Sequence, residues 1–152
     1  MREIVIGCDN AGFEMKNIIR EQLQKLGCTV EDVGCDSAAD DTLYPHIAGR
    51  VCEKVIASGF AKRGILICGT GIGMCMTANK FRGIRAAVGH DLYSARRSVL
   101  SNNGNVLCMG ARVIGPELAK MIASDWVQLE FADGPSTPKV EAIIETEAAN
   151  FH

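Results

Sequence analysis

The chain has 152 residues, 47% of them hydrophobic and 22% charged, and its formal net charge at pH 7 is -2. These values predict one soluble globular domain over residues 1–152 with a core of its own. The slight acidic balance argues against nucleic acid as a partner, and no apolar run approaches the roughly 20 residues of a membrane span.

In chain order, the first half alternates strand-like and helix-like patterns. Short apolar runs predict strands, and apolar side chains spaced three and four residues apart predict helices. Gly27, Pro45 and Gly59 are boundary signals. The predicted elements are a strand at 4–6, a helix at 15–26, a strand at 28–34, a polar loop at 36–44 and a helix at 45–58.

The second half continues the same alternation. Its predicted elements are a strand at 64–68, a glycine-rich loop at 69–73, a helix at 74–80, a strand at 85–88, a helix at 93–100, a strand at 105–109, a helix at 116–129 and a helix at 138–148. Continuous apolar strands between amphipathic helices are typical of a parallel sheet covered on both faces. We therefore expect an α/β, Rossmann-like three-layer αβα sandwich with a five-stranded parallel sheet.

The seven cysteines favour no disulfide framework and no metal site. They include no CxxC pair, and the first ten residues turn polar too early for a secretory signal. We expect buried, reduced cysteines in a cytoplasmic protein, because the cytosol keeps thiols reduced.

Ligands of such folds bind beyond the carboxyl ends of the strands, which here selects the loops at 8–12, 68–73, 89–93 and 109–112. In the second of these loops, three glycines follow Cys68, and their N–H groups suit an anion or a developing oxyanion. The helix that follows favours the thiolate form of Cys68. Asp9 ends the first strand, which should neighbour the third. A carboxylate, a thiol and an oxyanion cradle together suit proton abstraction next to a carbonyl. The alternative is a tight turn that binds nothing.

A nucleotide-binding role is a weaker alternative. The chain has no Gly-Lys-Ser/Thr sequence, and Met74 occupies the place of the third glycine in a dinucleotide fingerprint. Asp91 lies about where a ribose-binding acid would be. Arg112 and Lys139 are either phosphate clamps or solvated surface charges.

Several motifs together resemble the ribose-5-phosphate isomerase B / galactose-6-phosphate isomerase (RpiB/LacAB) family over essentially the whole chain. The matching segments are 65–73, 78–80, 83–86, 7–9, 44–46, Asn102, 110–115 and 140–143. The resemblance implies a homodimer or tetramer with active sites at the subunit interface. It also implies aldose–ketose isomerisation of a sugar phosphate through a cis-enediolate, without metal or cofactor.

The resemblance also implies roles for individual residues. Cys68 matches the base that moves the proton between C1 and C2, and Thr70 matches a hydroxyl near these carbons. Some relatives use a glutamate base at the place of Met74, which implies the cysteine variant here. The implied contacts to sugar, enediolate or phosphate are made by Asp9, Asn10, Tyr44, His46, Gly69, Gly71, Ile72, Gly73, Asn102, Arg112 and Lys139, the two basic residues binding phosphate partly across subunits.

Three departures from the pattern bear on the substrate. Ribose 5-phosphate isomerases usually have a histidine at the place of Asn10 and another at the place of Ser101. They usually have the pair Arg-His where this chain has Pro135-Ser136. The histidine at the place of Ser101 is the one assigned to opening the furanose ring. A tetrose 4-phosphate cannot form that ring because its O4 is esterified.

A branch of the family that acts on four-carbon phosphates resembles this chain at 89–91 and 100–103. We therefore favour erythrose 4-phosphate and erythrulose 4-phosphate over ribose 5-phosphate. His90 is a candidate acid, or else a capping or surface residue. The alternatives are a non-catalytic sugar-phosphate or nucleotide sensor on the same scaffold, and one subunit of a hetero-oligomer.

Overall fold

The computed structural model describes residues 2–151 and is built around a five-stranded parallel sheet. The strand order is β2-β1-β3-β5-β4. The strands are β1 (Glu3–Cys8), β2 (Thr29–Asp32), β3 (Arg63–Cys68), β4 (Ala86–Val88) and β5 (Val106–Gly110).

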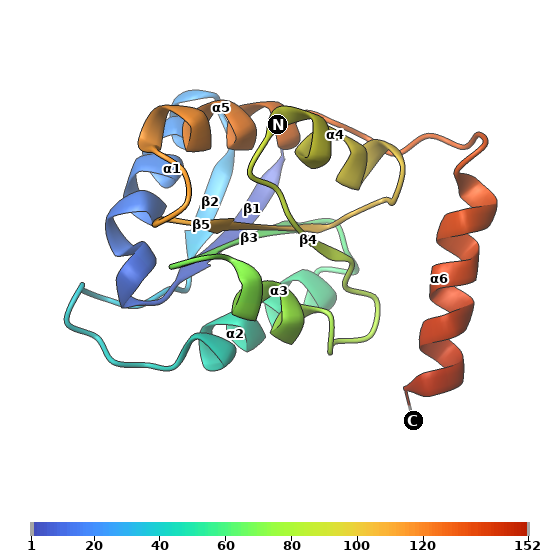
Figure 1. The fold of residues 1–152 in the computed structure, drawn as a ribbon, viewed down its shortest axis with the longest axis horizontal. Coiled ribbons are helices and arrows are strands. Elements are labelled where there is room, and N and C mark those ends of the chain that lie inside the picture. Colours follow the sequence, from blue (N-terminus) through green and yellow to red (C-terminus); the bar gives the residue numbers. More distant parts are fainter. Residues whose placement is uncertain (1, 152) are drawn as a thin grey trace.

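Helices cover both faces of the sheet, so the expected Rossmann-like three-layer sandwich is confirmed (Figure 1). Helices α1, α4 and α5 lie on one face, and α2 and α3 lie on the other. The helices are α1 (Phe13–Lys25), α2 (Tyr44–Ala57), α3 (Ile72–Ala78), α4 (Leu92–Leu100), α5 (Pro116–Trp126) and α6 (Thr137–Asn150), with a 3-10 turn, η1 (Asn10–Gly12), before α1.

The central strand β3 explains why the core has two halves. All six of its residues are buried, and successive side chains point to opposite faces. Ile65 and Ile67 pack with α1, α4 and α5, whereas Leu66 and Cys68 pack with α2 and α3. Cys68 therefore enters the layer that contains the start of α3.

Element boundaries differ from the sequence prediction by up to three residues, as three examples show. Helix α3 begins at Ile72 rather than at residue 74, because Gly71, with a φ of 78°, is its N-cap residue. Strand β2 ends at Asp32, yet Val33 and Cys35 still donate backbone hydrogen bonds to Ile6 and Cys8. Helix α5 ends at Trp126, three residues earlier than predicted.

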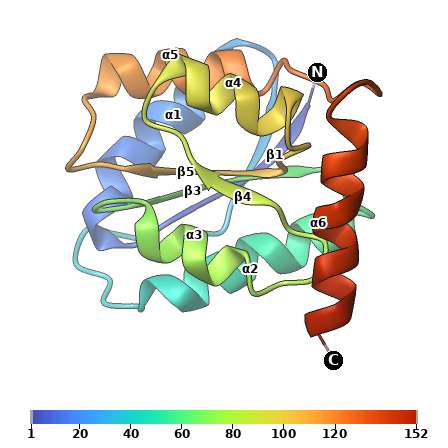
Figure 2. The same cartoon turned by 45° about the vertical axis from the view of Figure 1, so that its right-hand side comes forward.

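Helix α6 stands at the side of the sandwich rather than on it (Figures 1 and 2). It is tied to the domain where the Glu147 carboxylate accepts a hydrogen bond from Gly83 N, at 2.9 and 3.0 Å from its two oxygens. Ile143 and Ile144 remain 42% and 46% exposed. Among residues 2–151, no helix combines the length and apolar character needed to cross a bilayer.

Candidate active site

Strand pairing aligns the candidate residues along the carboxyl edge of the sheet. Cys8 pairs with Ile67, so Asp9 lies beside Cys68, and Asp9 N donates to Ile67 O at 3.3 Å. Cys68 in turn pairs with Gly110 at the end of β5. The predicted adjacency of the first and third strands is confirmed, and the carboxylate and the thiol share one edge.

The sulfur of Cys68 accepts a hydrogen bond from the backbone of its own loop. Gly71 N donates to Cys68 Sγ at 3.1 Å, and the Cys68 residue is only 6% exposed. The loop therefore holds the sulfur at the start of α3, with a backbone N–H directed at it.

The glycine loop packs directly against the end of β5. A Cβ on Gly71, whose φ is 78°, would lie 2.9 Å from the carbonyl carbon of Met109. A Cβ on Gly110 would lie 2.6 Å from Thr70 Cα. Ala111 N donates to Cys68 O at 2.9 Å. This close packing fixes the position of the sulfur relative to the loop.

Three polar side chains surround the glycine loop. Thr70 Oγ1 accepts from Ile72 N at 3.3 Å, which leaves its own hydrogen for donation. The guanidinium of Arg112 lies over the loop, since a Cβ on Gly69 would be 3.1 Å from Arg112 Nη1. A Cβ on Gly73 would overlap the ring of Tyr44. The structure therefore brings Arg112 and Tyr44 to the loop.

Asp9 is half-buried, and its Oδ1 accepts from Gly12 N at 3.2 Å, which caps η1. Asn10 is exposed within η1, and His46 is exposed in the first turn of α2. The structure brings Asn10 next to Asp9. Neither Asn10 nor His46 is held against the sulfur by a side-chain hydrogen bond within residues 2–151.

His90 lies two residues beyond the end of β4, at the same edge of the sheet as Cys68. Its Nε2 accepts a hydrogen bond from Gly110 N at 2.8 Å. Burial lowers the pKa of His90, so the ring favours its neutral form. The capping role in this turn belongs instead to Asp91, whose carboxylate accepts from Ser94 N at 2.7 Å. Nε2 is therefore an acceptor that holds the end of β5, and it has no proton to donate there.

Asn102 and Lys139 are not near Cys68 within one chain. Asn102 precedes β5, and Gly110 beside Cys68 ends it, so the strand's length of roughly 13 Å separates them. Lys139 lies exposed in the first turn of α6. The structure therefore does not bring these two residues to the site of their own chain.

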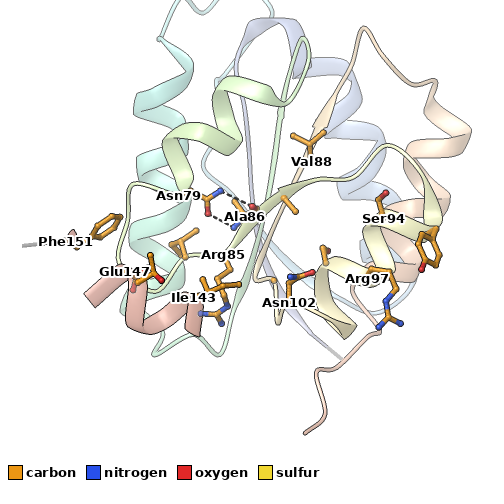
Figure 3. A pocket seen from close by; sticks show the side chains of 16 residues that line it. Asn79, Arg85, Ala86, Val88, Ser94, Arg97, Asn102, Ile143, Glu147 and Phe151 are labelled. Atoms are coloured by element: carbon orange, nitrogen blue, oxygen red, sulfur yellow. Dashed lines mark hydrogen bonds between the residues drawn. The ribbon is translucent and has the colours of Figure 1, made fainter. Parts of the chain in front are cut away.

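Asn102 instead lines a groove of about 690 Å³ between β4, α4 and α6. Figure 3 shows Asn102 and Arg97 on one wall and Ile143 and Glu147 of α6 on the other. Most of the exposed lining is apolar. The groove is therefore a different surface from the Cys68 loop.

Cys75 is a thiol that sequence reasoning did not single out. A hydrogen bond with Cys108 lowers the pKa of Cys75 to about 7, and the same bond raises the pKa of Cys108. Only the pairing of α3 with the facing strand β5 could have signalled this.

Met74 is fully buried in the core. Within residues 2–151, no group of three or more His, Cys, Asp or Glu is arranged to hold a metal ion.

Comparison with known proteins gives one family. A family model described as Ribose/Galactose Isomerase matches residues 4–143. D-erythrulose-4-phosphate isomerase of Pectobacterium atrosepticum is 51% identical, covering 94% of this chain and 93% of the relative. Ribose-5-phosphate isomerase B of Escherichia coli is 46% identical, covering 97% of each. The crystal structure of ribose-5-phosphate isomerase B from Mycoplasma genitalium with bound ribulose-5-phosphate aligns with a TM-score of 0.91 at 34% identity, covering 96% of each chain.

Proposed function

This chain belongs to the ribose/galactose isomerase family, and from that premise we propose that it interconverts erythrose 4-phosphate and erythrulose 4-phosphate. It is a sugar-phosphate isomerase, an enzyme that moves hydrogen between neighbouring carbons of one molecule without an external oxidant. One domain over residues 1–152 carries the site. The observation that carries the proposal is the sulfur of Cys68, held by Gly71 N beside Asp9.

In the proposed mechanism, the Cys68 thiolate removes the proton from the carbon next to the carbonyl. The electron pair of that C–H bond forms the enediolate double bond, and the carbonyl oxygen becomes an oxyanion. Gly71 N and Ile72 N already donate to Cys68 Sγ and Thr70 Oγ1, so the remaining N–H groups of the first turn of α3, which have no intrahelical acceptor, are available to this oxygen. Thr70 shuttles the hydroxyl proton between the two oxygens, and Cys68 returns its proton to the other carbon.

Ring opening is the step that distinguishes a pentose from a tetrose phosphate. Ser101 stands where the ring-opening histidine is expected, and its Oγ accepts a hydrogen bond from Arg97 Nε at 2.7 Å. A serine has no group that titrates near neutral pH, so it cannot replace the imidazole as an acid–base catalyst. The 51% identity to an erythrulose-4-phosphate isomerase supports the same preference.

The site is proposed to be completed by a second copy of the chain, in a homodimer or a tetramer. A partner that covers the groove would bury Ile143, which lines it and is 42% exposed. The backbone of Ala86 in the edge strand β4 is not free to pair with a strand of the partner, because its N–H and C=O each form a 2.9 Å hydrogen bond with the Asn79 side chain. Asn102 and Lys139 then serve the Cys68 of the partner, where Lys139 joins Arg112 at the phosphate.

The first test is a panel of C4, C5 and C6 sugar phosphates with the purified chain. We expect turnover of erythrulose 4-phosphate and its loss in Cys68→Ala. Efficient turnover of ribose 5-phosphate with none of erythrulose 4-phosphate would contradict the substrate. Uptake of solvent deuterium at C1 or C2 of the substrate would rule out the sensor, which is suggested by the absence of the usual histidines.

A second test asks whether the site is shared. Cys68→Ala and Lys139→Ala chains with different tags are co-expressed, and the mixed oligomer is purified. In a symmetric dimer each mixed pair retains one intact site, so about half the wild-type activity returns in the mixed species. Activity no higher than that of the two separate variants would contradict the shared site. The seven cysteines are free, which suits the reducing cytoplasm as the proposed location.

A further inference from the structure

Cys8 and Cys35 form a buried pair of thiols next to the active-site edge. Their sulfur atoms lie 3.6 Å apart, and the two residues are 0% and 1% exposed. Cys8 is the last residue of β1, and Cys35 lies just beyond β2. Cys35 N donates to Cys8 O at 3.1 Å, so the two backbones run side by side at this point.

This geometry suits a disulfide bond. Backbones paired in a sheet lie about 4.8 Å apart, within the roughly 4.4–6.8 Å between Cα atoms that a disulfide spans. An S–S bond measures about 2.05 Å, so the two sulfur atoms must approach by roughly 1.5 Å. Rotation of two side chains and a small shift of the loop after β2 suffice for this movement.

The surroundings indicate which thiol reacts first. Cys35 lines a surface pocket of about 330 Å³ together with Lys16 and Asp32. Lys16 Nζ donates to Cys35 O at 3.3 Å and pairs with Asp32 at 2.9 Å. Burial raises the pKa of Cys8 to about 12, so Cys8 stays protonated. A small oxidant that enters this pocket meets the residue Cys35, whereas Cys8 is not among the residues that line it.

We propose that Cys8 and Cys35 are a reversible redox modification site that a peroxide converts to a disulfide. The sulfur of Cys35 attacks one peroxide oxygen, the O–O bond breaks, and Cys35 becomes a sulfenic acid while water leaves. The sulfur of Cys8 then attacks the sulfur of Cys35, the S–O bond breaks, and the hydroxyl leaves as water with the proton of Cys8. Two thiols are oxidised and one hydrogen peroxide is reduced to two waters; a dithiol reverses the reaction.

The disulfide has a consequence for the site because Cys8 directly precedes Asp9. The hydrogen bonds of Asp9 to Ile67 O and Gly12 N set its position beside Cys68. Pulling Cys8 toward Cys35 moves Asp9 along with the chain end, and a displacement of about 1 Å costs up to about 10²-fold in rate. This effect on turnover rests on the proposed function, whereas formation of the disulfide does not.

The bond itself is tested with the purified full-length chain and hydrogen peroxide, followed by alkylation and peptide mass spectrometry. We expect a peptide pair linked through Cys8 and Cys35 that disappears on treatment with dithiothreitol. Cys35→Ser abolishes the link, whereas the matched control Cys28→Ser, a buried cysteine at the opposite end of β2, retains it. Circular dichroism checks that both variants fold. Absence of the linked pair in a folded wild-type chain overturns the proposal.

Turnover is measured on the same samples, normalised to the fraction of Cys68 that still takes up iodoacetamide. We expect the linked wild type to lose at least tenfold in kcat/KM and to recover with dithiothreitol, while Cys35→Ser is unaffected under the same conditions. A linked chain with unchanged turnover overturns the regulatory effect. A chain that is inactive before any oxidation instead overturns the proposed isomerase activity, while the linked pair can still form.

Discussion

Gly71→Ala tests whether the glycine loop holds the sulfur of Cys68 in place. Gly71 combines a φ of 78° with a position where a Cβ would lie 2.9, 3.1 and 3.2 Å from three backbone atoms of Met109. Its N–H is also the donor to Cys68 Sγ. A single methyl group therefore strains the local backbone, presses on a central strand and displaces that donor.

The cost has two separable parts. An L-residue in the left-handed region costs about 1–2 kcal/mol. Overpacking against atoms that cannot rotate away adds about 1–3 kcal/mol. The sum of about 2–5 kcal/mol corresponds to a decrease in Tm of roughly 5–15 °C for a domain of this size. Displacement of the N–H by about 1 Å lowers kcat/KM by up to about 10²-fold.

Two other glycines are matched controls. Gly59 has a φ of 66° and nothing within 4 Å of an added Cβ, so Gly59→Ala pays only the backbone strain. Gly134 has neither a positive φ nor a neighbour within 4 Å, so Gly134→Ala leaves the Tm nearly unchanged. Thermal melts followed by circular dichroism give the three Tm values, and isomerase assays give kcat/KM. The reasoning would be refuted if Gly71→Ala had the same Tm as Gly59→Ala and kept the kcat/KM of the wild type.

Three further predictions concern titrating groups. Cys68→Ser should lower kcat by about 10²–10⁴-fold, the contribution of a general base, and activity within tenfold of wild type contradicts that role. Because protonation of His90 removes the acceptor of Gly110 N, activity should fall as the pH drops below about 6.5 and through the lowered pKa. The stability that neutral His90 contributes should be lost over the same range, as measured by urea midpoints. His90→Gln retains an acceptor that does not titrate and should flatten the pH dependence of both activity and stability. If activity still falls at acidic pH as in the wild type, His90 is not the group responsible. Iodoacetamide at pH 7.5 should label Cys75, whose pKa is about 7, before Cys52, whose pKa burial raises to about 12, and labelling of Cys52 first refutes this order.

The sheet and half of the site could be predicted from the sequence because both depend on local patterns. Continuous apolar runs end in Asp9 and Cys68, and parallel strands place such ends on one edge. Three glycines after a buried strand similarly indicate a close backbone approach, which the contacts of Gly71 with Met109 bear out. These inferences need the order of the strands but no knowledge of side-chain rotamers.

The features that escaped prediction depend on contacts between segments that are distant in sequence. The hydrogen bond from Gly110 to His90 needs the β4–β5 register and one ring orientation. The proximity of Cys8 and Cys35 needs the chain after β2 to stay beside β1 after the regular strand has ended. No periodicity in the sequence encodes either contact.

The strand order also means that the candidate site can form only after the central strands have paired. Asp9, Cys68 and Gly110 come from three segments far apart in the chain, and they meet only when β1 and β5 have both docked against β3. Pairing between distant segments is slow compared with formation of the local helices. Helical circular dichroism should therefore recover before turnover in a refolding experiment, and activity should return only after the centre of the sheet is complete.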